Sequence, residues 1–159
     1  MSGYVPSREQ YREYATRGNL IPVYREVVAD GDTPVSAYAK LPSRDHTFLL
    51  ESVVGGEKWA AYSFIGAAPR LVFRSKAGRV HLTTRDVEGG GPDHELVLIT
   101  DDPLEALQAV LGDFRPEPPP GLPRFFGGAV GYVGYDVVRS FEHLPAKLPD
   151  DLGVPECYF

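Results

Sequence analysis

Glu51 and Ser52 are the strongest candidates in this sequence for side chains that bind a ligand or take part in a reaction. They follow the apolar run 48–50 and precede Gly55 and Gly56, where the chain can reverse. A carboxylate or hydroxyl buried at the end of a strand costs on the order of 1–3 kcal/mol or more unless it has partners. Two interpretations stay open: the strand surfaces at Glu51, or Ser52 and the neighbouring backbone form a small-molecule site.

Other motifs that carry chemistry are missing from the sequence. The glycines between 127 and 136 match neither a dinucleotide fingerprint nor a P-loop. Ser52 does not lie in a Gly-x-Ser-x-Gly elbow, and no sequence cue marks a base for it. The four histidines share no ligand-like spacing with cysteine or carboxylate, so no zinc site is predicted; they are His46, His81, His94 and His143. Cys157 is predicted to lie in the core of a strand.

The composition is ordinary for a soluble globular protein. The 159 residues are 43% hydrophobic and 24% charged, which suits one domain with a core. The net charge is −6 and the basic residues are scattered, so neither nucleic acid nor an anionic membrane is expected as a partner. One cysteine excludes an internal disulfide, and neither a signal peptide nor an apolar run of about 20 residues is present. We expect a cytoplasmic protein.

The elements that must position the candidate residues follow from hydrophobic periodicity and turn signals. Ser7 and Gln10 fit a capping box at the start of a helix, and Gly18 stands where that helix would stop. Thr33 and Pro34 start a second helix. The other predicted elements are a strand over 19–28, a hairpin over 48–66, strands over 70–74 and 79–84 with a turn at 75–78, a strand over 95–100, a helix after Asp101-Asp102-Pro103, a glycine-rich central strand over 125–136, a helical turn over 137–141 and a final strand to 159.

Many strands in hairpin order with a few separated helices predict an α+β fold with a largely antiparallel sheet. The glycines of the segment 125–136 indicate that another backbone or a large ring packs closely against it. Asp136 and Arg139, three residues apart, are predicted to form a local ion pair. The proline-rich stretch 115–123 is predicted to be a semi-rigid internal connection.

Three groups of motifs together suggest a family. They are Leu-Leu-Glu-Ser-Val at 49–53 with Gly-Gly-Glu-Lys-Trp at 55–59 and Tyr-Ser-Phe-Ile-Gly at 62–66; Gly-Asn-Leu-Ile-Pro-Val-Tyr-Arg-Glu at 18–26 leading to Thr-Pro-Val-Ser-Ala-Tyr at 33–38; and Gly-Gly-Ala-Val-Gly-Tyr-Val-Gly-Tyr-Asp at 127–136 with Val138-Arg139 and Phe141-Glu142. In this order, they resemble the N-terminal region of anthranilate synthase component I.

The resemblance implies an activity and a set of partners. The family opens tryptophan biosynthesis by converting chorismate and ammonia, or glutamine through a partner subunit, into anthranilate and pyruvate. The groups for the elimination, and the Mg²⁺ that holds carboxylates, would belong to a downstream domain, so no catalytic residue and no metal ligand is expected in residues 1–159. The implied partners are the chorismate-binding C-terminal domain of the same polypeptide, the glutamine amidotransferase subunit (component II) and L-tryptophan. The implied fold is a two-layer αβ sandwich around curved antiparallel sheets, of which this chain forms a part.

The resemblance also implies a regulatory site. The feedback inhibitor tryptophan would bind against Leu50, Glu51 and Ser52, with the Ser52 hydroxyl bonding the amino-acid head group. Ala61 stands where many relatives have a basic residue, so one partner for the inhibitor's carboxylate is absent. Lys58 is close enough in sequence to substitute, although a lysine in a turn is also accounted for by solvation alone.

The end of the sequence leads to a further expectation. Residues 154–159 stop within what reads as a strand, and the family's subunit is much longer. We therefore expect residues 1–159 to be the N-terminal domain of such a subunit, inactive alone and prone to self-association through an unpaired edge or an apolar face. Two alternatives stay open: the related aminodeoxychorismate synthase component I, and a free-standing amino-acid-binding module without catalysis.

Overall fold

The structure, a computed structural model, describes residues 3–42, 45–51, 62–85, 91–145 and 149–159. The chain forms two units, each treated separately below. The first comprises Met1–Val27, Val72–Leu82 and Glu95–Phe159, and the second comprises Val28–Leu71 and Thr83–His94.

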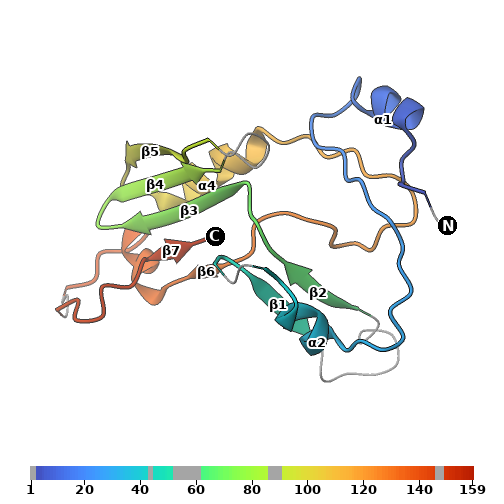
Figure 1. Cartoon of the computed structure of the whole chain (residues 1–159). Coiled ribbons are helices and arrows are strands. Elements are labelled where there is room, and N and C mark those ends of the chain that lie inside the picture. The colour runs from blue at the N-terminus through green and yellow to red at the C-terminus, as the bar shows by residue number, and fades with distance from the viewer. Residues whose placement is uncertain (1–2, 43–44, 52–61, 86–90, 146–148) are drawn as a thin grey trace. The chain divides into compact units, whose positions relative to one another are not determined.

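Two antiparallel sheets and a few helices confirm the α+β class. The larger sheet has the strand order β5-β4-β3-β7-β6 (Figure 1). Its strands are β3 (Leu71–Lys76), β4 (Arg79–Thr84), β5 (His94–Ile99), β6 (Tyr132–Val133) and β7 (Cys157–Tyr158). The smaller sheet pairs β1 (Phe48–Glu51) with β2 (Ser63–Gly66).

The turn between β3 and β4 is tighter than the sequence predicts. Ala77 and Gly78 both have positive φ angles, 49° and 73°, as a two-residue type I′ hairpin turn requires. Ser75 and Lys76 were expected in this turn but belong to β3. The strand is longer than expected because Ser75 is opposite Cys157 of β7, and this pairing continues the ladder.

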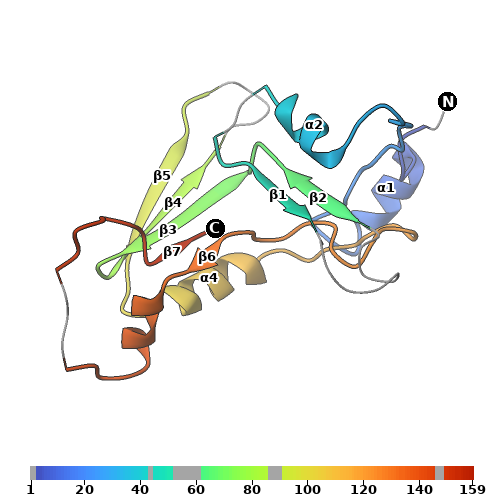
Figure 2. The ribbon, with the colours of Figure 1, turned by 90° about the horizontal axis from the view of Figure 1, so that it is seen from below.

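The core of the first unit lies between the sheet and the helix α4 (Pro103–Gly112), which covers one face of the sheet in Figure 2. Cys157 is fully buried, as predicted, and burial raises the pKa of its thiol. Its N–H donates to the buried Ser75 hydroxyl, with an N–Oγ distance of 3.0 Å, which satisfies the polar atom within the core. The buried apolar side chains around them are Val72, Phe73, Val80, Leu82 and Val137.

The prediction of a central strand over 125–136 is wrong, because the strand β6 covers two residues of this segment and lies at the edge of the described sheet. The close approach that its glycines indicate is confirmed. A Cβ on Gly131 would collide with the carbonyl oxygen of Tyr158, and one on Gly134 would lie 3.0 Å from the carbonyl oxygen of Glu156. These glycines let the backbone after residue 130 approach the backbone of β7 and its flanking residues.

The helix starts are as predicted. The helix α1 (Arg8–Tyr14) begins with the Ser7–Gln10 capping box, and α2 (Pro34–Ala39) begins with the Thr33 cap and Pro34 in its first turn. Asp102 caps α4 by accepting from two backbone N–H groups. The helical turn expected near 137–141 is the 3₁₀ helix η1 (Tyr135–Ser140), and within it Arg139 forms the predicted ion pair with Asp136 at 2.8 Å.

The predicted strand over 19–28 is wrong. The segment makes isolated bridges, Leu20 with Pro116 and Tyr24 with Val5, because its partners are short and separated in sequence. Where a strand would form further hydrogen bonds between two backbones, the Asn19 side chain bonds to the backbone instead. Its Nδ2 donates to the Asp113 carbonyl at 2.7 Å, and its Oδ1 accepts from the Arg115 N–H at 2.6 Å.

Gly18 also has a different role from the one predicted. The helix α1 ends at Tyr14, four residues earlier. A Cβ on Gly18 would lie 2.5 Å from the carbonyl oxygen of Arg115 and 2.9 Å from the Cβ of Glu117. The glycine is therefore required for the contact with the segment 115–117 and is not the stop of the helix.

None of the helices in the described ranges has the length and apolar character needed to cross a lipid bilayer.

The contact between Gly131 and β7 can be tested by substitution. Gly131→Ala should lower the free energy of unfolding by about 1–3 kcal/mol, because the added methyl group meets backbone that cannot rotate away. Gly127→Ala is the matched control, since nothing lies within 4 Å of its added Cβ. Urea unfolding curves of both variants provide the measurement, and equal stabilities would contradict the close approach.

Candidate functional site

The residues that the sequence predicts for a small-molecule site lie at one end of the hairpin formed by β1 and β2. Leu50 and Glu51 are the last two residues of β1. They pair with Phe64 and Ser63 of β2, respectively. Ser52 lies outside the described residues, as do Lys58, Ala61 and the predicted reversal at 55–56. The predicted pairing of two strands is confirmed, and the geometry of the site is described below for its remaining residues.

Phe48 and Gly66 fix the pairing at the other end of the hairpin. They are directly opposite one another, and a Cβ on Gly66 would collide with the Phe48 ring. A glycine lets the ring of the cross-strand neighbour cover its backbone, which excludes a side chain there. Because a shift by one residue would move every side chain to the other face, this contact also determines which side chains share a face at Leu50 and Glu51.

The helix α2 packs against both β1 and β2 (Figure 1). The Tyr38 hydroxyl forms a hydrogen bond of 2.8 Å with Thr47 Oγ1, one residue before β1, and this bond is partly buried. The site is thus supported by a helix whose start is set by local capping.

An ion pair connects the start of α2 to its end. The Lys40 ammonium donates to both Asp32 carboxylate oxygens, at 2.6 and 2.8 Å, and Ser36 Oγ donates to one of them at 2.9 Å. The Lys40 bond, and then the Ser36 bond, hold the pKa of Asp32 below its usual range. The stabilisation is therefore present above the carboxyl's usual pKa and is lost as the pH falls through its lowered value. Because the pair is exposed, its contribution is small.

Leu50 and Glu51 face opposite sides of the hairpin, because side chains alternate along a strand. The Leu50 face also carries Phe64, whose ring stacks with that of Tyr62 at a centroid distance of 6.2 Å and an interplanar angle of 27°. Leu50 and Tyr62 are 45% and 59% exposed, so an apolar and aromatic surface is open on this face. The other face carries the exposed Glu51 and Ser63, a carboxylate opposite a hydroxyl, and also the apolar pair Leu49 and Ile65.

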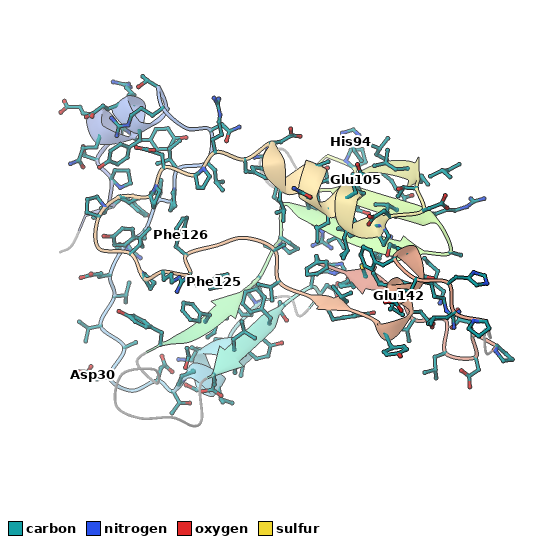
Figure 3. All side chains as sticks on the ribbon, turned by 180° about the vertical axis from the view of Figure 1, so that it is seen from behind. Asp30, His94, Glu105, Phe125, Phe126 and Glu142 are labelled. Carbon is teal, nitrogen blue, oxygen red and sulfur yellow. The ribbon has the colours of Figure 1, made fainter. Side chains whose placement is uncertain are left out.

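Two further concave places lie in the first unit. Residues 139–144 line an open depression of about 420 Å³, in which Arg139 is held by Asp136 and by the Leu144 carbonyl. Glu142, labelled in Figure 3, lies on this segment. A hollow of about 30 Å³, close to the size of one water molecule, lies between the turn after β3 and the start of α4. Neither place contains a residue predicted for the site.

The part of the chain that the structure describes does not provide a metal site. Within it, no three side chains of His, Cys, Asp or Glu come together in a way that could hold an ion. No metal-dependent step is assigned to these residues.

The side chains that β2 and its preceding residue contribute to this site were not predicted from the sequence. Tyr62 and Phe64 were part of a recognised motif, but the alternation that places them on the Leu50 face requires the register with β1. That register depends on the Phe48–Gly66 contact, so a glycine opposite an aromatic residue is the signal that could have indicated it.

Comparison with known proteins gives relatives over nearly the whole chain. Anthranilate synthase component 1 of Acetivibrio thermocellus is 42% identical over 156 residues, which are 98% of this chain and 30% of that protein. The proteins of the same name from Mycolicibacterium smegmatis and Pseudomonas putida are 44% and 42% identical over 94% of this chain, which corresponds to 28% and 30% of their lengths. The chain thus spans less than a third of each of these relatives. No protein-family model matches the sequence.

The Phe48–Gly66 contact predicts a coupled effect on stability. Gly66→Ala should lower the free energy of unfolding by about 1–3 kcal/mol, because its methyl group would occupy the place of the ring. In a Phe48→Leu background the same substitution should cost less, since the smaller side chain leaves room. A double-mutant cycle by urea unfolding should give a coupling of about 0.5–3 kcal/mol, whereas additive effects would show that the two residues do not interact.

Proposed function

Because this chain is related over 94–98% of its length to the N-terminal region of anthranilate synthase component 1, we propose that it forms the regulatory N-terminal region of such an enzyme. The observation that carries this proposal is 42% identity over 98% of the chain. The three named relatives share the anthranilate name, which supports anthranilate over aminodeoxychorismate as the product.

The proposed activity belongs to the longer polypeptide. It converts chorismate with ammonia, or with glutamine through the amidotransferase component II, into anthranilate and pyruvate. The elimination and the Mg²⁺ would be supplied by a chorismate-binding domain of the same polypeptide, which agrees with the small share of each relative that this chain covers. The role of residues 1–159 is then regulation, with Leu50, Glu51 and Ser52 as the segment that binds L-tryptophan.

The described structure supports this role in two ways. Leu50 and Glu51 lie at an exposed end of a hairpin whose other end is fixed by the Phe48–Gly66 contact. A ligand bound there would therefore contact two strands whose register is fixed. The helix α2 packs on both strands of the same hairpin, so a movement of the hairpin on inhibitor binding would also affect this helix. Inhibition requires that tryptophan bind the less active conformation more tightly than the active one.

A first experiment tests whether the catalytic groups lie outside residues 1–159. The chain of 159 residues, mixed with chorismate, Mg²⁺ and ammonia, should form no anthranilate, because the proposal places the reacting groups outside it. Product fluorescence provides the measurement, with a full-length anthranilate synthase as the positive control. Product formation above the buffer blank would overturn the proposal that these residues are regulatory alone.

A second experiment tests the regulatory site. In the full-length enzyme that contains this region, Ser52→Phe should raise the tryptophan concentration for half-inhibition at least about tenfold, because a bulky side chain would fill the space of the inhibitor. Val28→Phe is the matched control, since Val28 is 84% exposed in the same unit and outside the proposed site. Inhibition is expressed relative to each variant's own uninhibited rate. An unchanged half-inhibition in Ser52→Phe would remove Ser52 from the site.

A further inference from the structure

We propose that β5 is an interface strand, through which two copies of this chain pair in antiparallel fashion about a two-fold axis at Val97. The inference goes beyond the proposed function, since it concerns an edge of the larger sheet and not the hairpin of the candidate site. The strand at the end of the sequence does not offer such an edge, because β7 lies between β3 and β6 and is paired on both sides.

The strand β5 is an open edge of the sheet. In the part of the chain that the structure describes, its one neighbour is β4. The Thr100 N–H donates to the Gly78 carbonyl at 3.0 Å, so these two residues are directly opposite one another in the antiparallel ladder. Alternate residues bond the same neighbour, so the even-numbered residues of β5 bond β4, and the odd-numbered ones direct their N–H and C=O groups to the open edge. The odd-numbered residues are Glu95, Val97 and Ile99.

The devices that commonly guard an exposed edge are missing from the sequence of β5. It contains neither proline nor lysine. Its one carboxylate, that of Glu95, lies over the sheet, where a hydrogen bond of 2.9 Å joins it to His81 Nδ1 and Arg74 is 3.8 Å away. Two apolar side chains are open instead, since Val97 is 44% exposed and Ile99 is 86% exposed. An apolar edge of this kind is a template for another strand.

A second copy of the chain fits this edge, because β5 is complementary to itself. A two-fold axis perpendicular to the sheet pairs odd-numbered residues with one another, and these are the residues that face the edge. With the axis at Val97, that residue meets its own copy, and Glu95 meets Ile99 of the second copy in both directions. All the backbone groups that β5 directs outwards then have partners. On the other face of the sheet, the exposed Leu96 lies opposite Leu98 of the second copy.

The neighbouring registers fit less well. An axis at Leu98 would place Glu95 opposite Asp101 of the second copy, and like charges directly opposite one another are destabilising. An axis at Leu96 would place Ile99 opposite Asp93, a residue that precedes β5, and would so shorten the pairing. Charge and strand length therefore both favour the axis at Val97.

A cysteine scan in the full-length enzyme that contains this region tests the pairing. The residue on the axis faces its own copy at a Cα–Cα distance of about 5.5 Å, which suits a disulfide. Val97→Cys should therefore cross-link two polypeptides under mild oxidation, whereas Leu96→Cys and Leu98→Cys should do so at least about tenfold more slowly. Mass spectrometry of the linked peptides identifies the position. The enzyme without these substitutions is the control, in which Cys157 is fully buried.

Charged side chains at position 99 test the register independently. In a Val97→Cys background, Ile99→Glu should slow the cross-link at least about tenfold, because it places a second carboxylate opposite Glu95 of the other copy. Ile99→Lys is the matched control of equal polarity. It should stay within about twofold of the Val97→Cys variant, since it places an ammonium group opposite the same carboxylate. Unfolding curves verify that these changes at an exposed position leave the fold intact.

The outcomes separate the occupant of the edge from its register. Failure of Val97→Cys to cross-link would overturn the pairing of two copies through β5. A cross-link in the chain of 159 residues that is lost in the full-length enzyme would mean that another part of the polypeptide occupies β5, and a second copy would then be excluded as its occupant. Faster cross-linking of Leu96→Cys or Leu98→Cys, or equal slowing by Ile99→Glu and Ile99→Lys, would contradict the axis at Val97.

Discussion

The pairing of β7 with β3 is the interaction on which the first unit depends. Phe73 and Phe159 exchange two backbone hydrogen bonds, at 2.8 and 2.9 Å, and Ser75 accepts from the Cys157 N–H across 82 residues of sequence. The strand β7 lies between β3 and β6, so the described sheet holds together through residues that are far apart along the chain. Such pairing requires the closure of long loops, which slows the formation of a sheet relative to that of a local hairpin.

The second unit depends on a shorter-range constraint. The contact of the Phe48 ring with Gly66 fixes the register of the hairpin, and the register decides that Leu50 and Glu51 present different surfaces. The Phe48–Gly66 contact and the exposed Leu50 and Glu51 lie at opposite ends of the same two strands. Gly66 can therefore control which side chains share a face at the other end of the hairpin.

The parts of the fold that sequence predicts are those with local causes. The caps at Ser7, Thr33 and Asp102 act within three residues, and α1, α2 and α4 start where the sequence indicates. The strands expected over 19–28 and 125–136 failed because their partners lie far away in sequence: the Asn19 side chain bonds the backbone near 115. The candidate site follows the same division, since Leu50 and Glu51 were identified from a motif, whereas their separation onto two faces required the pairing with β2.

The side chain of Asn19 acts as a substitute peptide group, because its amide donates to one carbonyl and accepts from one N–H as a neighbouring strand would. Both of its partners are main-chain atoms, of Asp113 and Arg115, and every residue other than proline offers the same two groups. The effect of mutation therefore differs between the three positions, because the contact depends on the side chain at position 19 but not on those at 113 and 115. Side chains at 113 and 115 can change without losing it, whereas an aspartate at position 19 would keep the acceptor for the Arg115 N–H but lose the donor to the Asp113 carbonyl, which water would have to replace at this exposed site.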